Sequence, residues 1–114
     1  MIKQFLFGLA VAIAPMVAAA HSKSEATTPA DGATVTEVSE LSMRFDDPMR
    51  IIFVTLTAND DDIEIERETG MDPVTEFRAV PLEELAPGSY RFDWRGMASD
   101  GHPMQGNFSF TVAE

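Results

Sequence analysis

Cysteine is absent from this 114-residue chain, and histidine, tryptophan and tyrosine are scarce, at two, one and one residues. Without a thiol the protein cannot form disulfides, thiolate zinc sites, a blue-copper centre or a cysteine nucleophile. A small domain that lacks disulfides depends on its hydrophobic core alone for stability. Any metal held by this chain is therefore bound through nitrogen, oxygen or thioether groups.

Positive charge is also scarce, because Lys and Arg number 8 against 19 Asp and Glu, for a net charge of −11. A surface this acidic repels phosphate, which excludes nucleic acid and anionic lipid as natural partners. The densest acidic run, Asp60 to Asp62 with Glu64, Glu66 and Glu68, lacks the ordered glycine and terminal glutamate of an EF-hand loop. We interpret it as a solvated surface.

The amino-terminal residues have the pattern of an export signal. Lys3 is followed by the apolar stretch Phe5 to Val17 and by Ala18-x-Ala20, small residues typical of a signal-peptidase site. The apolar stretch is short for a membrane span and no second one follows, so we expect no membrane insertion. The sequence predicts a signal peptide at 1–20 and one mature exported domain at 21–114, whose net charge without Lys3 is −12.

Two other cleavage positions fit the same residues. Cleavage after Ala19, at Val17-x-Ala19, would leave Ala20 first, and cleavage after Ala18 would put His21 third, in a different type of amino-terminal metal chelate. Cleavage after Ala20 makes His21 the first residue of the mature protein.

The mature chain is dominated by short strand patterns separated by turn signals. Apolar and polar residues alternate with period two, as in strands that bury one face. The predicted strands are around Leu41–Phe45 (ended by Asp47-Pro48), Arg50–Ala58 (well buried), Ile63–Arg67, Val74–Val80, Tyr90–Trp94 and Phe108–Val112, with a short edge strand before Thr28. Helical character is limited to one turn at Glu83–Leu85. This predicts an all-β, antiparallel, immunoglobulin-like sandwich of about seven strands, with Trp94 and Tyr90 pointing inward and Asp31 capping its own turn.

The loop between the last two strands carries the strongest chemical signal. It contains Asp100 and His102, with Gly101 relieving steric limits between them and Pro103 favouring an extended His102. A mature His21 would add an α-amino group and an imidazole, which can close one chelate ring. Three nitrogens and one oxygen suit Cu(II), which binds such sites more strongly than Ni(II) or Zn(II). Protons compete for these nitrogens, so affinity should fall as pH drops from about 8 toward 5.

Each histidine also has a plain interpretation when considered alone. His102 could be an ordinary exposed loop residue, and His21 could lie beside the cleavage site by chance. The two together, in a chain with no other histidine, favour a shared metal ion.

The order of these motifs resembles the CopC family of periplasmic copper-binding proteins. The resemblance spans nearly all of the mature chain and rests on an amino-terminal histidine followed by Thr28-Pro29-Ala30-Asp31-Gly32, Leu41-x-Met43-x-Phe45 with an acidic residue, Pro87-Gly88-x-Tyr90-x-Phe92-x-Trp94-Arg95, and Ser99-Asp100-x-His102-Pro103-x-x-Gly106-x-Phe108-x-Phe110. It implies a small β-sandwich that binds one Cu(II) and serves copper resistance or delivery, often beside a CopD-type inner-membrane copper transporter.

By matching position, the resemblance implies Cu(II) ligands at the His21 amino group and imidazole, the Asp100 carboxylate and the His102 imidazole. An acidic fourth position falls on Asp47, where some members have glutamate; the shorter aspartate is either a ligand or an outer residue that shapes the site. The mid-chain region that is methionine-rich in some members contains only Met71 here. We therefore expect no dedicated Cu(I) site.

Two other functions are compatible with the sequence. An amino-terminal histidine paired with a second histidine also resembles the copper centre of lytic polysaccharide monooxygenases, although those enzymes use larger domains with a broad substrate face. The second alternative function is that of an immunoglobulin-like interaction module that binds no metal. Nothing in the sequence points to a hydrolytic triad or to an obligate oligomer, so we expect a non-enzymatic monomer.

Overall fold

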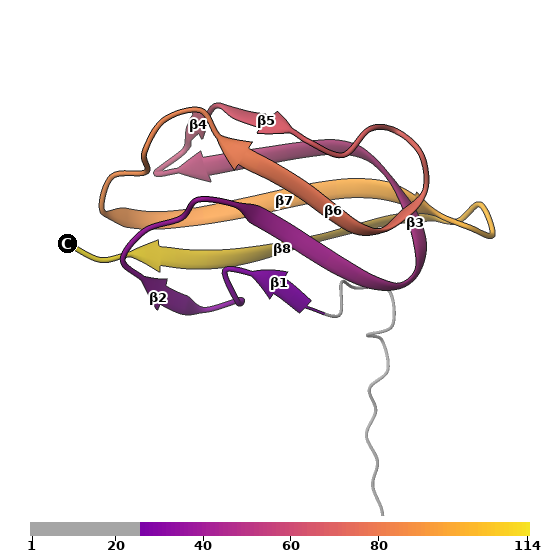
Figure 1. Cartoon of the computed structure of the whole chain (residues 1–114), viewed down its shortest axis with the longest axis horizontal. Coiled ribbons are helices and arrows are strands. Elements are labelled where there is room, and N and C mark those ends of the chain that lie inside the picture. Colours follow the sequence, from indigo (N-terminus) through magenta and orange to yellow (C-terminus); the bar gives the residue numbers. More distant parts are fainter. Residues whose placement is uncertain (1–25) are drawn as a thin grey trace, which may run out of the picture.

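The computed structural model describes residues 26–114, and Figure 1 shows them as strands that run along one long axis of the molecule. Within these residues no helix is long and apolar enough to cross a membrane. The strands are β1 (Ala26–Thr28), β2 (Ala33–Val35), β3 (Leu41–Ala58), β4 (Asp61–Ile63), β5 (Ile65–Arg67), β6 (Val74–Pro81), β7 (Gly88–Ala98) and β8 (Pro103–Val112). The all-β prediction is confirmed.

The long strand β3 joins the two layers of a β-sandwich. Its first part, Leu41–Arg44, pairs with β1 and β6, and its second part pairs with β7 and, near its end, with β4. The register shifts between Arg44 and Met49, where the strand turns at one end of the molecule (Figure 1). The prediction that Asp47-Pro48 ends the strand is wrong: Pro48 removes one ladder donor and bends the strand, but the backbone stays extended.

β7 and β8 form the long hairpin that the aromatic alternation predicts. Their antiparallel register runs from Gly88 opposite Val112 to Met97 opposite Pro103. β2 then adds to β8 in parallel, so the sandwich is not wholly antiparallel as predicted. The reason is that β2 is not joined to β8 by a hairpin but continues across the molecule to β3, and only hairpin neighbours must be antiparallel.

The turn before β2 is attached to β8 instead of being capped locally. Asp31 Oδ1 accepts a hydrogen bond from Ser109 N at 3.0 Å, and Gly32 N donates to Ser109 O at 2.7 Å. The prediction that Asp31 caps its own turn is therefore wrong. A single residue far away in the sequence, Ser109, supplies both partners.

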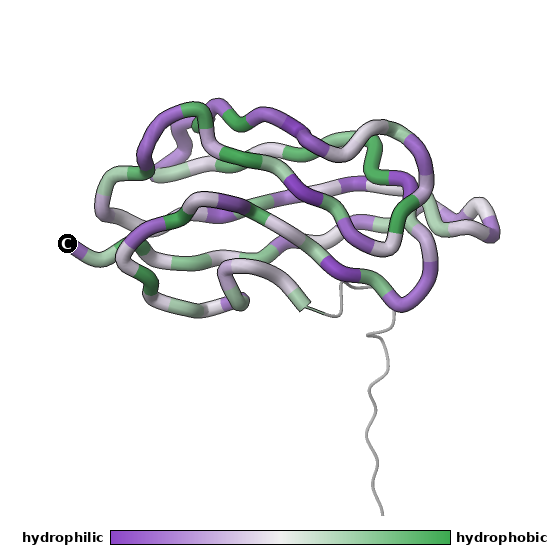
Figure 2. The backbone as a smooth tube through the Cα atoms, viewed as in Figure 1, coloured by the Kyte–Doolittle hydropathy of each residue, from purple (hydrophilic) through white to green (hydrophobic). Residues whose placement is uncertain are grey.

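The core lies between the layers and is mainly aromatic. Phe45 contacts Trp94 edge to face at a centroid distance of 5.3 Å, and Phe77 approaches Phe92 at 6.4 Å, so both pairs join strands of different layers. Trp94 and Tyr90 are buried as predicted. Figure 2 shows hydrophobic and hydrophilic residues alternating along the strands, the pattern expected when one face of each layer is buried.

One part of β3 departs from its predicted burial. The register with β7 shifts between Ile51 and Phe53, and this irregularity leaves the consecutive side chains of Ile52 and Phe53 exposed. An extra residue in a strand interrupts the alternation between faces. The prediction of a well-buried strand at Arg50–Ala58 is therefore wrong for the apolar residues Ile52 and Phe53.

Arg67 stabilises the backbone at this irregularity. Its Nη2 donates to Ile51 O at 2.7 Å and to Gly70 O at 3.0 Å, and its Nε donates to Thr69 O at 3.2 Å. The guanidinium also lies over the Phe77 ring, 5.1 Å from its centroid, and partial burial lowers the pKa of Arg67. One side chain thus holds β3 and the loop after β5 together.

We expect Gly96→Ala to destabilise the fold, because a Cβ at this position would lie 2.5 Å from the backbone oxygen of Arg50. Strands β3 and β7 would have to separate, and overpacking of this kind costs about 1–3 kcal/mol. Thermal unfolding should show a lower midpoint, by about 5–15 °C for a domain of this size. The matched control is Gly70→Ala, where nothing lies within 4 Å of the added Cβ; an equal loss in both variants would contradict the packing argument.

Candidate metal centre

The β7–β8 turn brings Asp100 and His102 to one end of the sandwich, where it forms the projecting loop of Figure 1. Ala98 N donates to His102 O and Gly101 N donates to Ala98 O, both at 2.9 Å. Gly101 has φ of +90°, a conformation that residues with a Cβ rarely adopt. The turn therefore needs glycine between the two candidate ligands, and the long hairpin behind it fixes its position.

Within this loop the Asp100 carboxylate holds His102 through two hydrogen bonds. Oδ1 accepts from the His102 backbone N at 3.1 Å, and Oδ2 lies 2.8 Å from His102 Nδ1. An ionised carboxylate can only accept, so Nδ1 carries the proton of this bond and the neutral ring presents the lone pair of Nε2. Metal-binding histidines commonly have their second nitrogen held in this way.

Both side chains are open to solvent, with relative exposures of 75% for His102 and 65% for Asp100. The hydrogen bond from the His102 backbone, followed by the one from its side chain, lowers the pKa of Asp100. Asp100 therefore stays anionic through the mildly acidic range in which imidazoles take up protons. The pair is an oriented, accessible nitrogen next to a fixed negative charge.

Asp47 lies at the same end of the sandwich but does not join this pair. It occupies the turn of β3, two residues before Met49, which is paired with Ala98 at the base of the loop. Its side chain is exposed. Among residues 26–114, no group of three or more His, Asp or Glu side chains is close enough to hold a metal ion, so Asp47 is a neighbour of the pair and not part of a formed cluster.

His21 and the predicted cleavage site lie outside the described residues. The described chain begins with β1, whose first residue, Ala26, is paired with Arg44. Because the pairing is antiparallel, the chain enters β1 from the direction of Asp46 and Asp47, at the end of the sandwich that carries the β7–β8 loop. Ala26 is therefore the residue of β1 nearest to that end of the sandwich.

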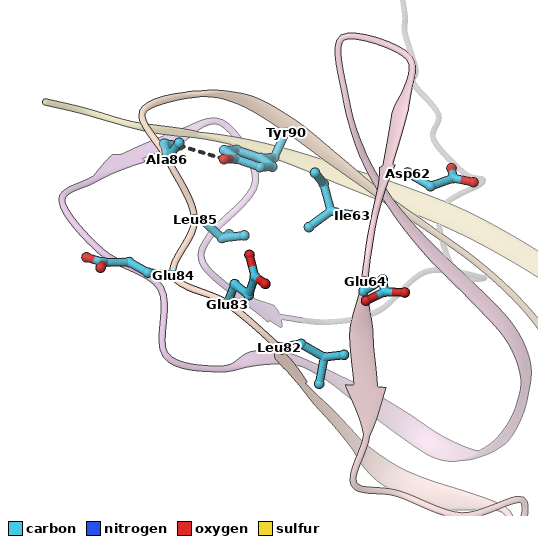
Figure 3. Close-up of a pocket in the computed structure, with 9 residues that line it drawn as sticks. All are labelled: Asp62, Ile63, Glu64, Leu82, Glu83, Glu84, Leu85, Ala86 and Tyr90. Atoms are coloured by element: carbon cyan, nitrogen blue, oxygen red, sulfur yellow. Dashed lines mark hydrogen bonds between the residues drawn. The ribbon is translucent and has the colours of Figure 1, made fainter.

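The acidic run after β3 forms no metal cluster within the described residues. Asp62 and Glu64 instead border a hollow at the opposite end of the molecule, shown in Figure 3, together with the loop that contains Glu83 and Glu84. That loop has no helical turn, contrary to prediction, because Leu85 turns inward between two prolines to pack on the core. The Tyr90 hydroxyl donates to Ala86 O and anchors the loop.

Sequence reasoning missed the apolar surface that lies beside the metal loop. Phe53 and Ile52 are 54% and 45% exposed, and Met97 is 39% exposed. The order of apolar and polar residues in Arg50–Ala58 does not reveal the register shift that exposes Ile52 and Phe53. The exposure of Met97 follows from its alternation with Gly96, a signal that could have been used.

Comparison with known proteins decides the family, because a model of the CopC domain matches residues 24–113. The chain belongs to the CopC family. The match contains the whole described sandwich and both members of the Asp100–His102 pair. The resemblance found in the sequence is thus confirmed.

Individual relatives of this CopC chain are described as copper resistance proteins. Copper resistance protein C of Pseudomonas syringae pv. tomato is 26% identical over 84% of this chain and 83% of that protein. Copper resistance protein C of Escherichia coli is 49% identical over a shorter stretch, 38% of this chain and 33% of that protein. The crystal structure of PcoC, a methionine-rich copper resistance protein from Escherichia coli, superposes with a TM-score of 0.67 at 27% identity, covering 82% of this chain and 99% of PcoC.

Proposed function

We propose that the mature protein is a periplasmic carrier that binds one Cu(II) ion per chain for copper resistance or homeostasis. The observation that carries the proposal is the Asp100–His102 pair, in which an exposed imidazole is oriented by a carboxylate 2.8 Å away. A nitrogen ligand with an adjacent anionic oxygen suits Cu(II). Membership of the CopC family supports copper as the metal.

The remaining ligands in this proposal are the amino group and imidazole of His21, exposed by cleavage after Ala20. Five residues, 21–25, precede Ala26, and an extended chain covers about 3.3–3.6 Å per residue, so they can reach roughly 17 Å. The direction in which the chain enters β1 supports a path toward the pair. The two nitrogens of His21 would occupy two adjacent positions of a tetragonal site, with His102 Nε2 and an Asp100 oxygen at the others.

Asp100 can serve both His102 and the ion, because each carboxylate oxygen has two lone pairs. Asp47, exposed at the same end, would then add negative charge beside the site. Release of copper to a CopD-type transporter is the delivery step that we propose. Met71 is the only methionine between residues 56 and 76, so the carrier would act on Cu(II) without a methionine-rich Cu(I) site.

The histidine-brace enzyme remains the second candidate but receives no specific support. The two aromatic side chains that the sequence offered for a substrate face, Trp94 and Tyr90, are both buried. Oxygen-dependent cleavage of polysaccharide in the presence of a reductant would favour the enzyme.

The function is tested by titrating the exported protein with Cu(II) while recording its electron paramagnetic resonance (EPR) spectrum and visible absorption. The expected result is saturation at one equivalent, with a tetragonal spectrum that shows nitrogen ligands. Intact mass establishes that His21 is the first residue. Absence of a protein-bound Cu(II) signal at one equivalent would favour a metal-free interaction module instead.

We also expect Cu(II) affinity to fall roughly 30- to 100-fold between pH 7 and pH 6. The α-amino group and the imidazoles of reference peptides titrate near about 7.7–8.0 and 6.5, so protons compete for each nitrogen in this range. Asp100 should not contribute, because its pKa is lowered and it stays ionised. Competition with a chelator at each pH measures the slope, and a pH-independent affinity would exclude nitrogen ligands.

A further inference from the structure

An apolar patch lies on the outer face of the sandwich, directly beside the β7–β8 loop. We define the patch as Ile52, Phe53, Met97 and Pro103. All four residues are exposed and line one shallow hollow. Large exposed side chains that gather at one place commonly mark an interaction site.

The backbone under the patch is firmly held. The register shift in β3 exposes Ile52 and Phe53 together, and Arg67 donates to the carbonyl oxygen of Ile51 at 2.7 Å. Across the sheet, Met97 is paired with Pro103 at the end of the β7–β8 register. The patch is thus a preformed surface, which reduces the ordering cost of binding a partner.

Two arginines adjoin the patch, since Arg50 is the cross-strand partner of Met97 and Arg95 that of Phe53. Arg95 is the only charged side chain among the described residues that line the hollow, and it is the cross-strand partner of both Phe53 and Gln105. The chain as a whole has a net charge of −11. Two copies meeting through this face would bring one acidic molecule toward another, so charge disfavours a second copy as the occupant.

The patch is also continuous with the candidate metal loop. Met97 lies three residues before Asp100, and Pro103 directly follows His102. A molecule seated on the patch would therefore contact the rim of the loop. This arrangement places the β7–β8 loop next to whatever the patch binds.

We propose that the patch is the docking surface for a protein that exchanges copper with the loop, and that this partner presents apolar side chains with a carboxylate opposite Arg95. The inference rests on the proposed function for the exchange of copper, but not for the docking itself. A surface of a few exposed side chains suits a weak, transient complex. Such a complex can form and separate with each transfer.

The test uses the full mature protein, labelled with ¹⁵N, and two defined peptide probes with the same phenylalanine and leucine residues. One peptide carries glutamates and the other carries lysines at the flanking positions. Nuclear magnetic resonance (NMR) titration with the glutamate peptide should give saturable shifts confined to the patch and Arg95. Binding of the lysine peptide should be at least about tenfold weaker.

Two variants make the test specific. Arg95→Glu should reverse the preference between the two peptides, and Phe53→Ser should weaken both by about tenfold or more. Leu82→Ser is the matched control, since Leu82 is equally exposed, at 53%, but lies at the opposite end of the sandwich. It should leave binding of both peptides unchanged.

Several results would overturn the docking proposal. These are equal binding of both peptides, shifts spread over the whole surface, or concentration-dependent shifts at Phe53 without peptide, which would identify a second copy as the occupant. The Cu(II) EPR spectra of Phe53→Ser and wild type should be identical, because a difference would place the patch within the metal site. If wild type binds the glutamate peptide but no Cu(II), the proposed function and the copper exchange fail, whereas the docking surface stands.

Discussion

His102→Ala is expected to lower Cu(II) affinity by roughly 10²- to 10³-fold. A four-ligand metal site in a small domain is worth about 10–16 kcal/mol in apparent binding free energy, judged from zinc. One ligand then accounts for about 2.5–4 kcal/mol, and each 1.4 kcal/mol corresponds to a factor of ten. Competition with a chelator of known affinity measures the change, and the EPR spectrum should show one nitrogen fewer.

The fold should tolerate this change, because the His102 side chain is 75% exposed and surface substitutions usually alter stability by less than about 0.5 kcal/mol. Ser99→Ala, in the same loop, is the control and should leave Cu(II) affinity unchanged. Asp100→Asn should have an intermediate effect, about 10- to 100-fold, because it removes the charge that orients the imidazole. Unchanged affinity in His102→Ala would remove the loop from the metal site.

An extra alanine placed ahead of His21 is expected to lower Cu(II) affinity by about 10²-fold or more. The α-amino group would then belong to another residue and could no longer close one chelate ring with the imidazole of His21. With the same free energy per ligand as above, losing one nitrogen ligand weakens Cu(II) binding by about 2.5–4 kcal/mol. The EPR hyperfine pattern should change together with the affinity, since the remaining nitrogens would adopt another arrangement.

The decisive control for the amino terminus is a double-variant cycle. If the His21 amino group and His102 bind the same ion, the extension and His102→Ala together should deviate from the sum of their separate effects. Strict additivity would indicate two independent copper sites. Intact mass of each preparation confirms which residue is first, and an unaltered affinity in the extended protein would contradict the proposed role of the amino group.

The candidate site was predictable to the extent that its members are close in sequence. Asp100 and His102 are two residues apart in a turn, so local chain geometry alone brings them together. Their exact relation was not predictable, because the hydrogen bond from the His102 ring to Asp100 depends on the loop conformation that Gly101 permits. Asp47 is 53 positions away from Asp100, and only the turn of β3 puts it at the same end.

The fold was predictable where the alternation of side chains is regular. Tyr90, Phe92 and Trp94 face the core as expected, because burial on one face of a strand imposes period two. The prediction failed at Asp47-Pro48 and at Ile52-Phe53, where the structure inserts a bend and a register shift within β3. These irregularities depend on how the two layers pack and on the hydrogen bonds that Arg67 donates to distant carbonyl groups. The residues around each irregularity do not reveal either of these contacts.

The sequence alone determined the class of the fold, the family and the chemistry of the loop, since these depend on residue types and on spacings of a few positions. The tertiary structure decided which distant segments meet at one end of the sandwich. It also decided that Ile52 and Phe53 face solvent beside the loop. Pairing between strands far apart in sequence sets these relations, and pairing is selected by the packing energy of the whole core.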